Sequence, residues 1–287
     1  MDAFDPTTQS TILTVLAAAS FLMGGLIGSF LNVCVYRMPA GLSVVNPRSR
    51  CPRCENPVLW YDNVPVISWL ILGAKCRFCK LPISWQYPLV ESITAVLFYF
   101  VFMKFGLTIA TPIYMVLMAG LVLTTFIDLT DWTIPDTVSI GGMPVGIAVT
   151  LLAMFVDGTG LVLDNPVMSL IGLAIGFGSL YALDLISLAL FKKKGMGFGD
   201  VKLIGMLGTF FGPVGVLVII ILSSMVGSVI GLSVIIANRG KEEDVGEDNV
   251  GHYLPFGPYI CLGGIAYLFF GPELVQFYLD YLNVPPY

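Results

Sequence analysis

The amino-acid sequence predicts an all-α polytopic membrane protein that carries one small polar insert. Of the 287 residues, 56% are hydrophobic and only 11% are charged, and the mean hydropathy is +0.88. These values separate the chain from soluble globular proteins. Apolar stretches of about 20 residues, the length that crosses a bilayer, recur along most of the chain, whereas a signal peptide would be one short stretch. We therefore interpret the first stretch as a retained span in the lipid bilayer.

About eight transmembrane helices are expected from these stretches. The stretch 201–237 needs a division, because it is too long for one span and contains Gly212 followed by Pro213. We expect the helix to break there. The expected spans are 10–35, 88–104, 108–128, 137–156, 167–191, 199–211, 214–237 and 256–277.

The basic residues indicate the orientation of these spans. When the loops alternate between the two sides, every lysine and arginine except Lys104 falls on one side. The positive-inside rule makes that side cytoplasmic and places both termini outside. Because the charges are sorted by segment, the net charge of -5 does not indicate acidic or basic binding partners. Nothing in the pattern indicates nucleic-acid binding.

The chain is accordingly divided into three parts. Residues 1–35 are the first transmembrane segment, residues 36–86 a cytoplasmic domain with four cysteines, and residues 87–287 a membrane domain. The middle part is the one sizeable polar insertion. We find no internal repeat and no low-complexity tract.

Two Cys-x-x-Cys pairs lie in the insert, CPRC at 51–54 and CRFC at 76–79. This spacing is typical of a zinc ribbon, in which two knuckles offer four thiolates to one Zn²⁺. An insert this short buries little core, so a metal would supply stability that packing does not. A dithiol redox centre is the alternative, which a reducing cytoplasm disfavours. Zinc would be either purely structural or close to the chemistry. The candidate ligands are Cys51, Cys54, Cys76 and Cys79.

Two aspartates lie where apolar stretches meet the cytoplasmic boundary, Asp128 at the end of one span and Asp200 at the start of another. Carboxylates at such positions are costly and mark functional sites. Two carboxyl groups brought together share a proton, so that one activates water and the other protonates the leaving group. The pair predicts peptide hydrolysis without a metal or a nucleophilic side chain. For Asp200 alone, the alternative is a carboxylate that only complements the positive end of its helix.

The sequence GMGFGDVK at 195–202 leads into the span that begins with Asp200. We expect Gly197 and Gly199 to let the backbone turn sharply and approach a substrate strand. A phosphate-binding loop is disfavoured, because no Gly-Lys-Ser/Thr follows and a helix rather than a strand precedes. Lys202 is interpreted as part of this active-site loop, or as a side chain that reaches the membrane surface.

Together these motifs resemble those of the type IV prepilin peptidases, membrane aspartyl proteases with a Gly-x-Gly-Asp signature. The resemblance implies an enzyme that cleaves the basic leader of prepilins or pseudopilins at the cytoplasmic face of the bacterial inner membrane, in type IV pilus assembly or type II secretion. It further implies N-methylation of the new N-terminal residue with S-adenosylmethionine, and it places the catalytic pair on Asp128 and Asp200 within 87–287. The matching motifs, in the family's order, are GSFLNVCVYRMP (28–39), the two Cys-x-x-Cys pairs, YPLVE (87–91), IDLTDWTIPD (127–136), GMGFGDVKL (195–203) and LPFGPY (254–259).

The chain departs from the family's pattern at one place. Many relatives have Asp-x-Asp at the first aspartate motif, whereas here Thr130 stands at the third position and Asp131 follows it. We expect Asp131 to be solvated and Asp136 to begin the next helix. In the family the cysteine-bearing insert is associated with methylation, so its presence implies both activities. A leader peptidase without methyltransferase activity is the alternative, because no Rossmann fingerprint for the methyl donor is present.

Further interpretations concern the roles of the two aspartates, an acidic stretch and the alternative classes of protein. The helix ends suggest that Asp200 is the base and Asp128 the acid. The acidic stretch 242–248 is interpreted as a solvated loop, with attraction of the basic leader as the alternative. A transporter is disfavoured because the chain shows no paired repeats, and a scaffold that docks through a zinc ribbon would not need two acids at one depth.

Overall fold

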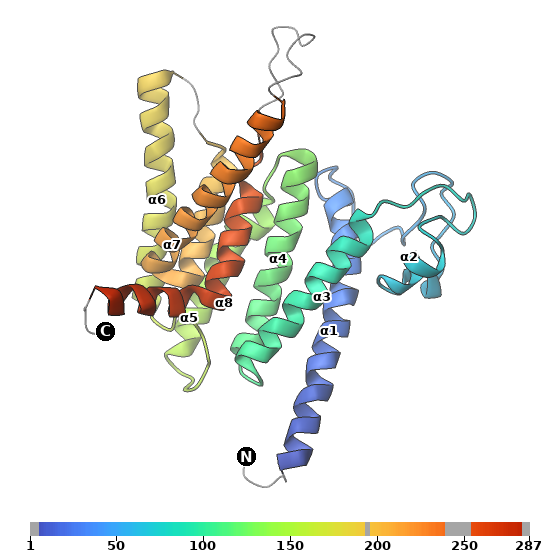
Figure 1. Ribbon diagram of the computed structural model, residues 1–287, viewed down its shortest axis with the longest axis horizontal. Helices are drawn as coiled ribbons and strands as arrows, with labels where there is room; N and C mark the ends of the chain where they lie inside the picture. The colour runs from blue at the N-terminus through green and yellow to red at the C-terminus, as the bar shows by residue number, and fades with distance from the viewer. Residues whose placement is uncertain (1–5, 193–195, 239–253, 283–287) are drawn as a thin grey trace. The chain divides into compact units, whose positions relative to one another are not determined.

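The computed structural model describes residues 6–192, 196–238 and 254–282. Within these ranges it contains eight α helices, one short 3-10 helix and no β strand. Seven of the helices are long and apolar enough to cross a membrane, and their arrangement is drawn in Figure 1. The predicted all-α polytopic fold is confirmed. Gly195 and the acidic stretch 242–248 lie outside the described residues.

The chain divides into two compact units, which are described separately. The division falls inside helix α4, directly before Asp128. The division expected from the sequence follows the polar insert instead, and it stays a prediction. The first unit comprises residues 1–127 and 158–160, and the second comprises residues 128–157 and 161–287.

Helices α1 and α3 of the first unit lie side by side and antiparallel (Figure 1). The Asn32 side-chain amide donates a hydrogen bond to the backbone oxygen of Tyr87 at 3.1 Å. One turn along, a Cβ on Gly28 would lie only 2.7 Å from the Glu91 Cα atom. Glycine at Gly28 and at Gly24, one turn earlier, therefore lets the two backbones approach. The elements of this unit are α1 (Pro6–Arg37), η1 (Trp60–Asn63), α2 (Ile67–Ile71), α3 (Gln86–Phe105) and α4 (Ala110–Asp131), the last of which continues into the second unit.

In the second unit, three helices pack against the long helix α7. Gly172 on α6 faces Gly208 and Gly212 on α7, and a Cβ on Gly172 would lie 2.8 Å from the Gly212 Cα atom. At the same crossing the Ser169 hydroxyl donates a hydrogen bond to the Thr209 backbone oxygen at 2.8 Å. Small side chains thus bring α6 against α7 without any apolar bulk between them. The helices of this unit are α5 (Asp136–Ala153), α6 (Pro166–Phe191), α7 (Phe198–Asn238) and α8 (Gly257–Tyr281).

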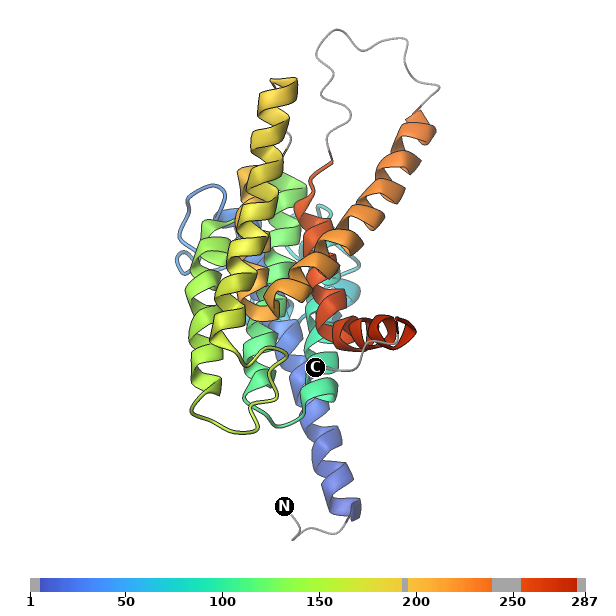
Figure 2. The same ribbon diagram turned by 90° about the vertical axis from the view of Figure 1, so that its left-hand side faces the viewer.

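Helix α7 bends at Gly212, which has φ 69° and ψ -175°. This φ lies in the left-handed region that favours glycine, and the following Pro213 has no backbone N–H to donate. Figure 2 shows the two arms of α7 leaving the bend in different directions. The predicted break is therefore present. Because both arms belong to one apolar helix, Phe198–Ala237, seven candidate spans are found among the described residues where about eight were expected.

The starts of α5 and α6 follow from their first residues. The Asn165 side chain accepts hydrogen bonds from the backbone N–H groups of Val167 and Met168 at 2.9 and 3.3 Å, which caps α6. Pro166 occupies the first helical position, where no N–H is needed. Asp136 is the first residue of α5, as predicted.

The glycine crossing of α6 and α7 is tested by two alanine substitutions on the same helix. Gly172→Ala places a methyl group into the α7 backbone, so we expect a loss of about 1–3 kcal/mol in the free energy of unfolding. Gly178→Ala is the matched control, because a Cβ there meets nothing within 4 Å. We expect it to keep or raise the melting temperature, measured in detergent by thermal unfolding. Equal melting temperatures for the two variants would contradict the close crossing.

Candidate active site and cysteine centre

Asp128 lies in the last turn of α4 and is 6% exposed. Its Oδ2 atom accepts a hydrogen bond from the backbone N–H of Gly257 at 3.1 Å, and Gly257 is the first residue of α8. A Cβ on Gly257 would lie 2.5 Å from the same oxygen, so glycine is required for this approach. The carboxyl group is therefore held at the start of a helix distant in sequence.

Asp200 lies in the first turn of α7 and is 8% exposed. Its backbone N–H donates a hydrogen bond to the Gly197 backbone oxygen at 3.1 Å, which closes the turn that leads into the helix. The Asp128 carboxylate acts electrostatically on Asp200. Both aspartates are thus buried in the second unit, Asp128 with its carboxylate against the start of α8 and Asp200 in the first turn of α7, and close enough for one charge to influence the other.

The side chain of Ile134 connects the two aspartate segments. It lies 3.0 Å from the position that a Cβ on Gly199 would take, and 3.1 Å from the corresponding position on Gly257. Neither Gly197 nor Gly199 has a positive φ, so no left-handed backbone requires glycine there, and the expected approach of a substrate strand stays a prediction. At Gly199 the requirement is space for Ile134. At Gly197 a Cβ would lie 3.2 Å from Asp200 Oδ2, so the absent side chain leaves that carboxylate room.

Lys202 pairs with Asp136, the first residue of α5, through its Nζ atom and the Asp136 Oδ1 atom. The same ammonium group lies 5.4 Å from the centre of the Phe198 ring, a favourable position for a cation. The lysine therefore ties the start of α7, where Asp200 lies, to the start of α5. The sequence motif predicted Lys202 in the active-site loop, whereas its pairing with Asp136 arises from tertiary packing.

Asp184 on α6 is a residue that sequence analysis missed. Its Oδ1 atom accepts a hydrogen bond from the Met196 backbone N–H at 3.3 Å, in the segment just before Gly197. The signal was present, because an acidic residue within the apolar stretch 167–191 is a functional candidate by default. Asp184 thus fixes the approach of the chain to Asp200.

The remaining acidic residue of this region, Asp131, is exposed, as expected. Its carboxylate accepts a hydrogen bond from the adjacent Thr130 hydroxyl at 2.9 Å.

The α8 start that faces Asp128 changes the assignment of acid and base. A positive helix end now lies at both Asp128 and Asp200, so the helix-end argument no longer distinguishes the two groups.

The four cysteines of the insert come together as predicted. Their Sγ atoms all lie within 4.8 Å of one another, with 3.9 Å between Cys51 and Cys79 and 4.0 Å between Cys54 and Cys76. Four thiolates around one Zn²⁺ at the usual bond length are separated by about 3.8 Å, so the cluster fits a tetrahedral metal site.

The two cysteine pairs have the same backbone form. The N–H of Glu55 donates to the Cys51 oxygen at 2.9 Å, and the N–H of Lys80 donates to the Cys76 oxygen at 3.0 Å. Glu55 and Lys80, each directly after a pair, have positive φ values of 56° and 58°. The repetition supports the prediction of two zinc-ribbon knuckles.

Backbone N–H groups aimed at the sulfur atoms favour thiolates in both knuckles. The backbone and side-chain amides of Asn56 lower the pKa of Cys54 to about 7. The backbone N–H groups of Cys79 and Phe78 lower the pKa of Cys76. For Cys79 the Leu81 N–H acts in the same direction, but burial and the neighbouring thiols prevail and raise its pKa to about 11. A divalent cation would relieve this crowding of four sulfurs, because metal ligation deprotonates thiols.

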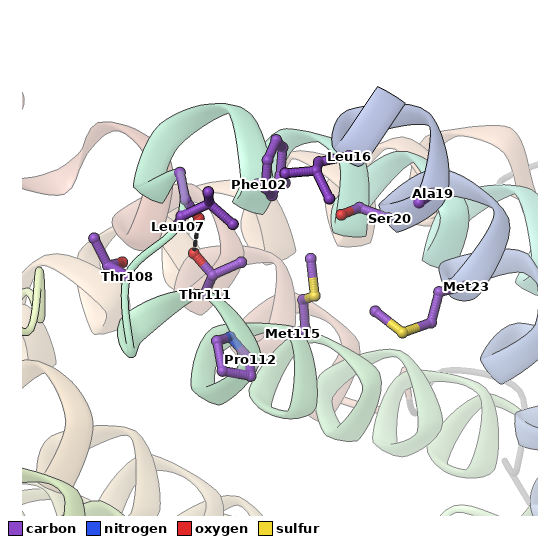
Figure 3. Close-up of a pocket in the computed structure, with 11 residues that line it drawn as sticks. Leu16, Ala19, Ser20, Met23, Phe102, Leu107, Thr108, Thr111, Pro112 and Met115 are labelled. Carbon is purple, nitrogen blue, oxygen red and sulfur yellow. Dashed lines mark hydrogen bonds between the residues drawn. The ribbon is translucent and has the colours of Figure 1, made fainter. Parts of the chain in front are cut away.

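A separate cavity of about 490 Å³ lies in the first unit, between α1 and the loop that joins α3 to α4. Its walls are apolar apart from a few hydroxyl groups, among them that of Thr111, which bonds the Gly106 backbone oxygen at 2.6 Å (Figure 3). It contains no acidic or basic side chain among the described residues, so it does not belong to the aspartate site.

Comparison with known proteins decides the family. The model of the bacterial peptidase A24 N-terminal domain matches residues 22–105, and the model of the type IV leader peptidase family matches residues 115–232. The chain belongs to the type IV leader peptidase family. The N-terminal match contains all four cysteines of the cluster, and the second match contains Asp128 and Asp200. No solved structure matches the chain.

Several relatives of this family bear the name prepilin leader peptidase/N-methyltransferase. The protein from Aeromonas hydrophila is 33% identical over 90% of this chain and 92% of its own length. That from Pseudomonas aeruginosa is 32% identical over 91% of this chain and 93% of its own. The relative from Myxococcus xanthus is 39% identical over 78% of this chain, and the match spans 64% of that relative. The resemblance inferred from the motifs is confirmed.

The pairing of Lys202 with Asp136 is tested by a double-mutant cycle. Because Asp136 is well exposed to solvent, we expect Lys202→Gln and Asp136→Asn each to cost no more than about 1 kcal/mol in the free energy of unfolding. The double variant should cost no more than the worse single variant, since the two groups act as a pair. Asp131→Asn is the control and should be neutral. Additive costs of the two substitutions, measured by thermal unfolding, would show that they act independently.

Proposed function

We propose that this protein cleaves the basic leader of type IV prepilins or pseudopilins and then methylates the new N-terminal residue, with S-adenosylmethionine as the methyl donor. Membership of the type IV leader peptidase family and the shared name of its relatives support this function. The observation that carries the peptidase activity is the burial of Asp128 and Asp200 at two helix starts, within electrostatic reach of each other. The protein is a multi-pass membrane enzyme.

In the proposed mechanism, one carboxylate accepts a proton from a water molecule as the water oxygen attacks the scissile carbonyl carbon. The other carboxyl group gives its proton to the leaving amine nitrogen when the C–N bond breaks. The products are a leader with a new carboxylate and a mature chain with a free amino group. The Gly257 N–H holds Asp128, while Gly197 keeps space beside Asp200. The acid and base exchange roles as protons move, so the expected assignment of Asp200 as base stays a prediction.

The proposed substrate geometry follows from the ends of the helices. Asp128 is in the last turn of α4 and Asp200 in the first turn of α7. Lys192 follows the end of α6 and Lys202 lies near the start of α7, and by the positive-inside rule these basic residues support a position of the acids on the cytoplasmic side of the inner membrane. A prepilin carries a basic leader before an apolar helix, so its scissile bond lies at the boundary where these acids are.

The methyltransferase activity rests on the named relatives rather than on a binding site in the structure. A methyl donor with amino and carboxylate groups needs polar partners, whereas the cavity of the first unit is lined by apolar and hydroxyl side chains alone. We therefore assign no residue to the donor. The methyl group would pass to the free amine that cleavage produces, which makes peptide cleavage the first of the two reactions.

The metal in the proposed enzyme is Zn²⁺ held by Cys51, Cys54, Cys76 and Cys79. The matching backbone form of the two cysteine pairs and the distances between their sulfur atoms support this metal. All four ligands are thiolates, which closes the coordination shell and gives the metal a structural role. It would hold the insert together and takes no part in the hydrolysis.

Zinc content gives a direct test of this centre. We expect one zinc per chain in the purified protein by elemental analysis. Cys51→Ser or Cys76→Ser should lose the metal and lower the melting temperature, because metal binding is coupled to folding. Cys34→Ser and Cys261→Ser are the controls, since both cysteines are buried in candidate spans and neither belongs to the four-sulfur group. Full zinc content in a Cys51→Ser variant would contradict the assigned ligands.

The proposed function is tested by mass spectrometry of a prepilin produced together with the enzyme. With the wild-type enzyme we expect a shortened chain whose N-terminal residue carries one methyl group. With Asp128→Asn or Asp200→Asn we expect uncut precursor. Asp131→Asn, the exposed neighbour, should process normally.

Each other outcome has a distinct meaning. Normal cleavage by either the Asp128 or the Asp200 variant would contradict the catalytic pair. A shortened but unmethylated product from the wild-type enzyme would indicate a leader peptidase without methyltransferase activity. Uncut precursor with the wild-type enzyme would contradict the proposed function.

A further inference from the structure

The pairing of α1 with α3 gives a scale of depth along the first unit. Asn32, Gly28 and Gly24 on α1 face Tyr87, Glu91 and Ala95 on α3, in steps of four residues on both helices. Helix α3 has 20 residues, which is about 30 Å and the thickness of the hydrocarbon core. Its first residue, Gln86, therefore marks the membrane boundary on the side of the insert.

The segment before α2 contacts α1 and α3 on the membrane side of this boundary. The Val66 backbone N–H donates a hydrogen bond to the Glu91 carboxylate at 2.7 Å, and Glu91 is only 7% exposed. The neighbouring Pro65 packs on α1, where its Cβ lies 3.4 Å from the position of a Cβ on Gly25. Glu91 lies five residues into α3, so this contact is about 8 Å inside the boundary. The insert thus returns to the level of the spans (Figure 1).

The chain at this level has no charge. Residues 63–74, NVPVISWLILGA, contain no acidic or basic side chain. Three large apolar side chains of the short helix α2 point away from the protein: Ile67, Leu70 and Ile71 are 56%, 63% and 77% exposed within the structure. An outward apolar face at this depth is suited to acyl chains rather than to water.

The polar groups of the same segment are paired internally, as a lipid environment demands. The Ser68 hydroxyl donates to the Tyr61 oxygen at 2.9 Å and accepts from the Val64 N–H at 3.0 Å. The Trp69 indole N–H donates to the Ile83 oxygen at 3.3 Å. In α2 and in the turn that follows it, the backbone N–H groups of residues 67, 68, 70, 72, 73 and 74 donate hydrogen bonds to backbone oxygens of the same segment.

We propose that residues 64–72, which we call the α2 anchor, insert into the lipid leaflet beside α1 and α3 and hold the cysteine knuckles at the membrane surface. The Pro65 and Val66 contacts join this segment directly to α1 and α3. Trp60 and Trp85 flank the anchor at the expected membrane–water interface, where tryptophan is enriched. Their side chains are 84% and 68% exposed. Lys75 and Lys80 are exposed beyond it, within reach of anionic headgroups.

A photo-crosslinking experiment on the full-length protein in native membranes tests the anchor. The substitution Ile71→p-benzoylphenylalanine is compared with the same substitution at Leu22, a 67% exposed residue on α1, and at Phe78, a 50% exposed residue of the second knuckle. After irradiation, intact-mass spectrometry identifies the adduct. We expect phospholipid adducts at position 71 in yields similar to those at position 22, and none at position 78.

Two results would overturn the proposal. Crosslinks from position 71 to another part of this chain, to a second copy or to a co-produced prepilin would show that protein covers the α2 face. Absence of a lipid adduct at position 71, while position 22 yields one, would place α2 in water. The readout needs no catalytic activity, so it is independent of the proposed peptidase and methyltransferase functions.

Discussion

A carboxylate that accepts a hydrogen bond from a backbone N–H outside its own helix is the interaction on which the arrangement within each unit depends. Asp128 receives the Gly257 N–H at the start of α8, and Asp184 receives the Met196 N–H before α7. In the first unit Glu91 receives the Val66 N–H before α2. In each case an acidic group that is costly in an apolar helix gains a partner, and a loop gains a fixed position.

The glycines also fix the positions of the helices, because they leave space for close contacts. Gly257 and Gly199 leave space for the Asp128 carboxylate and the Ile134 side chain, while Gly172 and Gly212 let α6 and α7 approach. Larger residues would push the helix starts apart and separate the acids that they hold. The proposed chemistry therefore depends on helix packing as directly as on the aspartates. The cysteine knuckles are held differently, by the proposed zinc and by the segment whose Val66 N–H binds Glu91.

Much of the fold followed from the sequence because its signals are local. Apolar length predicted the spans, Gly212 and Pro213 predicted the bend, and two Cys-x-x-Cys pairs predicted a four-sulfur cluster. The partners of the acids did not follow, because residues such as Asp128 and Gly257 are brought together only by tertiary packing. For Gly199 the position was identified but its contact with Ile134 was not, since such a contact cannot be read from spacing. Asp184 was overlooked, although its place in an apolar stretch was a sufficient signal.

The central claim is that Asp128 and Asp200 act as one catalytic pair. It is tested most directly by initial rates of prepilin cleavage with purified wild-type enzyme, Asp128→Asn, Asp200→Asn and the double variant, all at matched zinc content. Groups that act as a unit are strongly non-additive, so the account predicts that each single variant is as slow as the double variant. A double variant much slower than either single variant, with losses that multiply, would mean that the two carboxylates act independently and would contradict the account.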